Sequence, residues 1–283
     1  MTIRNPVEWS IDQMKIAGLA AESAGHAVGE SAAAPPAVRK IGFADLKRAL
    51  AKGIDDFAAC RSDVIFLCLV YPVAGLVLWR VAFDYEMLPL LFPLASGFAL
   101  LGPFAAVGLY EMSRRREQGV HAALPDALGV VRSPAFGRIL ALGLVLVILF
   151  LLWLVAASAV YHVTLGPKPP ESLQAFARDV LTTGAGLAMV ALGMGVGFLF
   201  ALAALAVGAF SFPMLLDRDV PVATAVLTSA RALWANPGAM AGWGLIVAAG
   251  LAIGSLPALL GLIVVMPVLG HATWHLYRAA IAR

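Results

Sequence analysis

Two histidines one helical turn apart are the residues of this sequence best suited to chemistry. His271 and His275 lie four residues apart in the stretch 270–278 (GHATWHLYR), so a helix places both imidazoles on one face. Two imidazoles in this arrangement can bind a metal ion, and a single one can bind haem iron. Trp274 and Tyr277 favour a simpler role, because Trp and Tyr anchor helix ends at the membrane–water boundary. We interpret the pair as part of such an anchor, with metal or haem binding as the alternative.

A second polar stretch, residues 211–219 (SFPMLLDRD), ends in an Asp-Arg-Asp triplet. Pro213 is expected to end an apolar helix, which places the triplet at the inner interface. A local ion pair that fixes a turn explains these residues, and a conformational switch or a partner site is the alternative. The candidate polar cluster at the inner face therefore comprises His271, Trp274, His275, Tyr277, Asp217, Arg218 and Asp219. Glu111 and His121 are expected at a similar depth.

Other signatures of chemistry are missing from the sequence. It has no phosphate-binding glycine loop, no HExxH and no GxSxG motif. The spacing of Cys60 and Cys68 matches no familiar zinc pattern and indicates no disulfide framework. We therefore predict no catalytic residue, no bound metal and no cofactor.

The composition indicates an integral membrane protein. Of the 283 residues 61% are hydrophobic and only 13% are charged, whereas a soluble domain has about 25% charged residues. Continuous apolar runs long enough to cross about 30 Å of hydrocarbon predict helices rather than a barrel. The net charge of +3 does not indicate a nucleic-acid partner, because the basic residues flank these runs.

Six apolar segments predict an all-α, polytopic transmembrane helical bundle over residues 42–283. The predicted spans are 64–83, 87–110, 139–163, 184–216, 239–254 and 257–277. Prolines are expected to bend the second span, and the fourth is expected to tilt or to break near Pro213. The last two are predicted as a hairpin, and one long tilted helix, which would give five spans, is the alternative.

The distribution of basic residues predicts the orientation. With the N-terminus inside, the inner side holds 17 of the 20 Lys and Arg residues, and the outer side holds only Arg80, Lys168 and Arg178. This asymmetry is the positive-inside pattern. We predict a multi-pass protein of the bacterial cytoplasmic membrane with both termini cytoplasmic.

The segment before the first span divides into a tail and a helix. Residues 1–41 are predicted to be a flexible cytoplasmic tail, since they are rich in Ala, Gly, Ser and Glu. Residues 43–57 predict an amphipathic helix, whose apolar face comprises Leu46, Leu50, Ile54 and Phe57, with Phe43 extending it. We expect this helix to lie in the cytoplasmic interface, and packing within a small soluble domain is the alternative.

Similar helices precede the third and fifth spans, which suggests an internal repeat. Pro125, Ala127, Val131 and Ser133 align with Pro221, Ala223, Leu227 and Ser229 at a constant offset. The chain therefore predicts three copies of an interfacial helix followed by a two-span hairpin.

Four pieces of the sequence resemble a family of predicted bacterial integral membrane proteins. They are FPMLLDRD, GHATWHLYR, Asn236-Pro237 and the pattern Ala44-Asp45-Leu46…Gly53…Asp56-Phe57. That family is known only as a domain of unknown function (number 2189), and the resemblance runs from about residue 42 to residue 278. It implies an inner-membrane location and no established activity. Members sometimes carry an oxidase-subunit label, which this chain does not support, because such a subunit needs about twelve spans and six histidine ligands. This chain has five histidines.

The function that the sequence favours is a non-enzymatic structural, assembly or accessory role in the membrane. The alternatives are a metal- or haem-binding protein that uses His271 and His275, and a transporter or channel for a small, weakly charged solute. No predicted span carries a charged residue in its middle third, which makes ion-coupled transport less favoured. The predicted partner is the lipid bilayer, and a membrane-protein partner or a second copy stays open.

Overall fold

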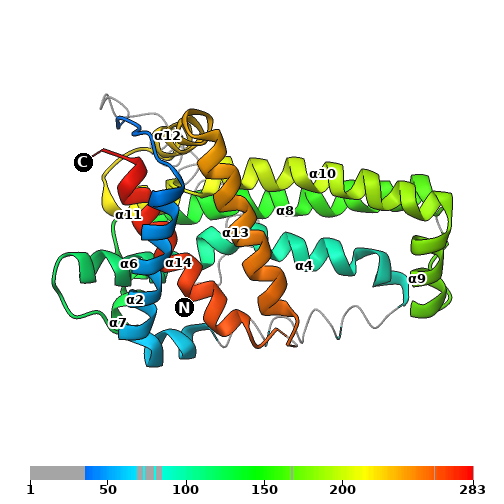
Figure 1. Cartoon of the computed structure of the whole chain (residues 1–283), viewed down its shortest axis with the longest axis horizontal. Helices are drawn as coiled ribbons and strands as arrows, with labels where there is room; N and C mark the ends of the chain where they lie inside the picture. Colours follow the sequence, from blue (N-terminus) through cyan, green and yellow to red (C-terminus); the bar gives the residue numbers. More distant parts are fainter. Residues whose placement is uncertain are drawn as a thin grey trace, which may run out of the picture.

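A computed structural model describes residues 36–68, 73, 80, 85–166, 168–257 and 259–282, and this part of the chain is helical (Figure 1). It contains no β-strand, only an isolated antiparallel bridge between Val38 and Ile281. The helices are α2 (Phe43–Cys68), α4 (Leu91–Leu100), α5 (Gly102–Ala105), α6 (Val107–Glu117), α7 (Leu124–Gly129), α8 (Phe136–Thr164), α9 (Leu173–Thr182), α10 (Gly184–Gly208), α11 (Ser211–Asp217), α12 (Val222–Ala235), α13 (Pro237–Ser255) and α14 (Leu262–Ala280), with 3₁₀-helices η1 (Tyr85–Leu90) and η2 (Val130–Arg132). The all-α prediction is confirmed for these residues.

Three helices in the described part are long and apolar enough to cross a membrane: α8, the segment Gly184–Asp217, and α13. They coincide with the predicted third, fourth and fifth spans. α8 and α10 lie side by side along the long axis of the molecule, with α4 beside α8 (Figure 1). Their large apolar side chains point outward, as at Leu152 and Phe198, which are 53% and 66% exposed. Exposing such an apolar surface to water is unfavourable, whereas contact with lipid is favourable.

The predicted second span, 87–110, is divided into four short helices and is not one continuous helix. Pro89 lies inside η1, and Pro103 lies in the first turn of α5, directly after the break at Leu101. A proline removes one backbone hydrogen bond and its ring clashes with the preceding turn. The prolines therefore interrupt this segment more strongly than the predicted bend.

The predicted break near Pro213 is confirmed. α10 ends at Gly208 and α11 begins at Ser211, so the helix is interrupted at Ala209, the residue whose carbonyl would pair with position 213. Polar side chains satisfy the backbone there. The Ser229 hydroxyl of α12 accepts a hydrogen bond from Phe210 N at 3.2 Å, and the Ser211 hydroxyl donates one to Val207 O.

α13 and α14 are two helices that pack against each other after a turn, and they do not form one long helix. Glycines allow the close approach at this turn, since a Cβ atom on Gly261 would lie 2.7 Å from Gly254 O. α14 begins at Leu262, five residues after the predicted start of the sixth span, and it is not among the three candidate spans.

α2 packs along α14 with a different face from the one predicted. Leu46 is buried in the protein, together with Ala49, Gly53, Asp56 and Cys60. Ile54 and Phe43 are exposed, at 53% and 69%. Small residues bring the backbones of the two helices together, so packing against protein decided which face is buried. Leu46 therefore packs against protein and not in the interface, whereas the interfacial position of the helix as a whole stays a prediction.

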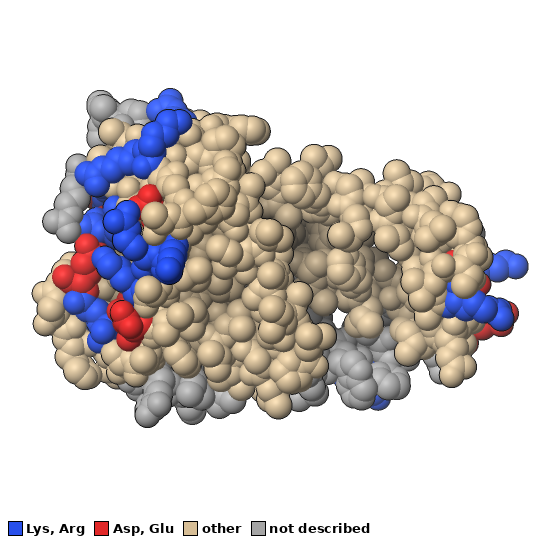
Figure 2. Space-filling view, in the orientation of Figure 1, with Lys and Arg blue, Asp and Glu red and all other residues tan. Residues whose placement is uncertain are grey.

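On the face drawn in Figure 2, the charged side chains of the described residues gather at the two ends, and the described surface between these ends is largely uncharged. One end holds α2, α6, α11 and the C-terminal part of α14, and the other holds α9 (Figure 1). The sequence reading missed α9, which Ser172 caps by accepting a hydrogen bond from Ala175 N at 3.1 Å.

Most of the predicted tail lies outside the described residues, as does most of the predicted first span, 64–83. The two ends of the described chain are hydrogen-bonded to each other. Arg39 N donates to Ala280 O at 2.7 Å, and Ala282 N donates to Ala37 O at 2.9 Å. The segment before α2 therefore lies beside the end of α14.

Candidate functional site

The centre of the polar cluster is a buried carboxylate, Asp56, on the face of α2 that packs against α14. Its Oδ2 atom accepts hydrogen bonds from the Ser113 hydroxyl at 2.6 Å and from His275 Nε2 at 2.8 Å. Its Oδ1 atom accepts one from Arg116 Nε at 2.8 Å. Because Ser113 and Arg116 belong to α6 and His275 to α14, this one side chain ties three helices together.

The second histidine joins the network through Ser113. His271 is fully buried, and its Nδ1 atom lies 2.8 Å from the Ser113 hydroxyl oxygen. A hydroxyl has one hydrogen, and Ser113 donates it to Asp56, so His271 Nδ1 must be the donor in its contact with Ser113. His271 Nε2 is buried and has no hydrogen-bond partner among the described residues.

A second carboxylate, Asp217 of α11, holds the end of α14. It accepts hydrogen bonds from the Tyr277 hydroxyl at 2.8 Å and from Arg278 Nη1 at 3.1 Å. Arg278 also pairs with Glu117 of α6 at 3.1 Å and lies over the ring of Trp274. These contacts connect α11, α14 and α6.

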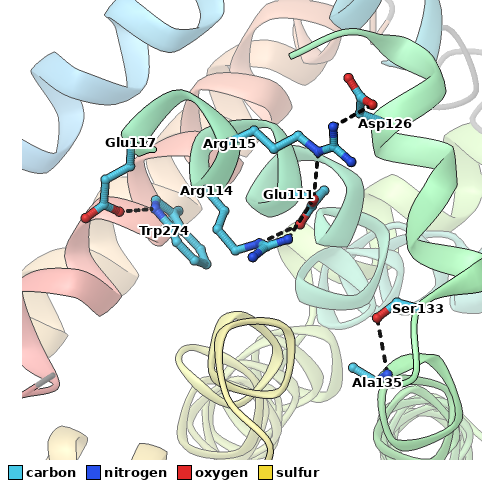
Figure 3. A network of polar contacts seen from close by, with 8 residues as sticks. All are labelled: Glu111, Arg114, Arg115, Glu117, Asp126, Ser133, Ala135 and Trp274. Carbon is cyan, nitrogen blue, oxygen red and sulfur yellow. Dashed lines mark hydrogen bonds and ion pairs between the residues drawn. The ribbon is translucent and has the colours of Figure 1, made fainter. Parts of the chain in front are cut away.

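α6 carries its own set of ion pairs, which Figure 3 shows from close by. Glu111 accepts two hydrogen bonds from Arg114, at 2.7 and 2.9 Å, and one from Arg115 at 2.9 Å. Arg115 reaches on to Asp126 of α7 at 2.8 Å. At the other end of α6, Glu117 accepts a hydrogen bond from the indole of Trp274 at 3.0 Å (Figure 3).

The electrostatic balance at Asp56 favours the carboxylate form. Burial alone raises the pKa of Asp56, but the hydrogen bonds from His275, Ser113 and Arg116 outweigh it and bring the pKa to about 2. Asp56 is therefore ionised at neutral pH, as its role as a triple acceptor requires.

The structure brings most of the predicted cluster together. His271 and His275 meet at Asp56, while Trp274 and Tyr277 meet Glu117 and Asp217. Arg218 lies 3.8 Å from Asp217 and donates to Ala282 O. Asp219 does not belong to the cluster, because its side chain is 91% exposed and pairs with Arg138. The contact between Asp217 and Arg218 is consistent with a local ion pair in the triplet, and its role in fixing the turn stays a prediction.

Four residues of the site were not predicted: Asp56, Ser113, Arg116 and Glu117. Asp56 was part of the quoted family pattern, but the helical reading placed it on the polar, solvated face of α2. Glu111 and His121, expected at a similar depth, do not join the histidines in the described network: Glu111 pairs within α6, and His121 is exposed in the loop after it. The available signal for Asp56 was its place in that family pattern.

Chemically, the cluster is a set of paired charges. Its carboxylates accept hydrogen bonds from Arg, His, hydroxyl or indole donors, as at Asp56, Glu111, Glu117 and Asp217. Among the described residues, no group of three or more His, Cys, Asp or Glu side chains is placed to hold a metal ion. The arrangement is suited to holding helices together in a fixed geometry.

The long apolar helices and the charged end define this chain as a helical integral membrane protein. Residues 91–217 match the family described as "Predicted integral membrane protein (DUF2189)", which confirms the resemblance seen in the sequence. The match covers α4 to α11 and includes most of FPMLLDRD, whereas the pieces in 42–57 and 270–278 lie outside it. No curated protein and no solved structure matches the chain.

Proposed function

We propose that this protein is a non-enzymatic structural, assembly or accessory component of the bacterial cytoplasmic membrane. The observation that supports this role is that the polar cluster connects helices of this chain. Its buried side chains make hydrogen bonds within the chain, and these bonds tie α2, α6, α11 and α14 into one unit. A rigid polar end on an apolar body is suited to presenting a fixed cytoplasmic surface.

We further propose six spans with both termini cytoplasmic, built as three copies of an interfacial helix and a hairpin. The pairing of residues 37–39 with 280–282 supports an even number of crossings, because hydrogen-bonded segments lie on the same side of a membrane. The positive-inside asymmetry supports the orientation. The exposure of Val131 and Leu227, which occupy aligned positions of two proposed copies, supports the repeat.

Single-cysteine labelling tests this topology, with Cys60 and Cys68 replaced by Ser. A cysteine inserted directly after Met1, and cysteines at Arg115, Arg218 and Arg283, are expected to react only after the membrane is permeabilised. A cysteine at Lys168 is expected to react in intact cells. Labelling of position 283 from outside in intact cells would contradict an even number of spans.

Replacing His271 and His275 together with Gln separates the structural role from metal or haem binding. The double variant is expected to insert in the membrane, with the same visible spectrum and metal content as the parent. Its free energy of unfolding is expected to be lower by roughly 2 kcal/mol, because two hydrogen bonds of about 1 kcal/mol each are weakened. Absorption spectroscopy, metal analysis and thermal unfolding in detergent measure these three properties.

His162→Gln is the matched control, since this histidine is exposed and hydrogen-bonds only within α8. It is expected to leave stability and spectrum unchanged. A stoichiometric metal or haem in the parent that is lost in the His271/His275 variant, but kept in the control, would reject the non-enzymatic proposal in favour of metal or haem binding.

A further inference from the structure

An open cavity lies on the charged end, between α2, the C-terminal part of α14 and the end of α6. Its volume is about 680 Å³. Five cationic and four acidic side chains line it, which gives a net charge of +1: Arg39, Arg48, Lys52, Arg116 and Arg278 against Asp45, Asp55, Asp56 and Glu117. His275 and two alanines complete the lining.

The two kinds of charge are not used equally. Asp45 pairs with Arg48, Asp56 with Arg116, and Glu117 with Arg278. The side chains of Arg39 and Lys52 have no ion-pair partner among the described residues, and neither does Asp55. The cavity therefore offers two cationic groups that neighbouring carboxylates do not neutralise, with one exposed carboxylate near them.

The position of Arg39 places the cavity at the membrane boundary. Asn236, the residue directly before α13, accepts a hydrogen bond from Ile41 N at 2.9 Å and donates one to Arg39 O at 3.0 Å. A Cβ atom on Gly242 in α13 would lie 2.8 Å from the ring of Phe43. Because α13 is a candidate span, the first residues of α2 lie at the end of a membrane-crossing helix.

We infer that this cavity binds the phosphate of an anionic membrane phospholipid through Arg39 and Lys52. A phosphodiester carries one negative charge, which matches the net charge of +1. Basic pockets on the cytoplasmic side of membrane helices suit anionic headgroups. The inference rests on the membrane location of α13 and is independent of the proposed structural, assembly or accessory role.

Native mass spectrometry of the detergent-purified full chain tests the inference with three probes: phosphatidylglycerol, phosphatidylcholine and inorganic phosphate. Phosphatidylglycerol is expected to bind in preference to the other two. In the Arg39→Gln/Lys52→Gln variant its apparent affinity is expected to fall roughly thirtyfold, since each of the two basic residues near an anionic surface contributes on the order of 1 kcal/mol.

The matched control is Lys47→Gln/Arg231→Gln, which removes the same charge from exposed positions that do not line the cavity. It is expected to keep the parent affinity. Lys52→Gln alone gives a smaller loss and serves if the double variant folds poorly. Equal binding of phosphatidylcholine, or an equal loss in the control, would overturn the site. Tight binding of inorganic phosphate would overturn the inference that the phosphate in the cavity belongs to a lipid. Failure on any of these measures leaves the His271/His275 test of the proposed function unaffected.

Discussion

Asp56→Ala is expected to destabilise the protein by roughly 3 kcal/mol at neutral pH. The change leaves Arg116 and His275 without their shared acceptor and removes the group to which Ser113 donates. Removing one partner of a buried charge pair has an effect of this size, because the other charge is left without compensation. Thermal or SDS-induced unfolding in mixed micelles, followed by circular dichroism, measures the loss.

The same carboxylate predicts a dependence on pH. The pKa of Asp56 is about 2 in the folded protein, below its ordinary value of 3.8. A lowered pKa means that the stabilisation is complete above pH 4 and is lost as the pH falls from about 4 towards 2. The wild type is therefore expected to lose more stability between pH 6 and pH 3 than Asp56→Asn does.

Asp55→Asn is the control for both measurements. Asp55 is the neighbouring acid on the same helix, but it is exposed and has no partner among the described residues. Its replacement is expected to change the free energy of unfolding by less than about 0.5 kcal/mol. Equal losses of stability on replacing Asp55 and Asp56 would show that the negative charge of α2, and not the buried network, provides the stabilisation.

The sequence was sufficient where one physical effect dominates. α8 is predicted almost to its ends because an uncharged apolar run of its length has one stable form in lipid. The break before Pro213 follows from the missing N–H of proline. The polar end of α14 follows from the spacing of its histidines and aromatic residues.

The sequence was insufficient where the answer depends on a partner helix. The apolar pattern of α2 suggested a face through Leu50 and Ile54, yet Gly53 and Asp56 face α14, and periodicity alone could not identify them. Asp56 reads as a solvated charge until Ser113, Arg116 and His275 are placed around it. These residues lie 57 to 219 positions away along the chain, so only the packing of three helices brings them together.

Gly53→Ala is expected to be strongly destabilising, because Gly53 lies where α2 crosses α14. A Cβ atom at position 53 would lie 2.7 Å from Ala272 N, 2.8 Å from Ala272 Cβ and 2.8 Å from Val268 O. Two of these atoms are backbone atoms of α14, which no side-chain rotation can move. The helices must separate, and we expect a loss of about 3 kcal/mol, the upper end for overpacking.

Gly193→Ala is the matched control, because this glycine also lies within a helix but a Cβ atom there would meet nothing within 4 Å. It is expected to be neutral or to stabilise by up to about 1 kcal/mol, since alanine favours a helix more than glycine does. In the same unfolding assay, only Gly53→Ala is therefore expected to lower the stability.

A second-site change identifies the cause of the Gly53→Ala loss. Ala272→Gly removes the side-chain atom from the clash but leaves Ala272 N and Val268 O in place, so it is expected to restore only part of the lost stability. Complete rescue would mean that the two backbones are not held at this distance by the rest of the fold. No rescue at all would mean that the methyl acts elsewhere than at the α2–α14 crossing. Partial rescue, measured as a double-mutant cycle, is the result that a crossing fixed by close backbone contact requires.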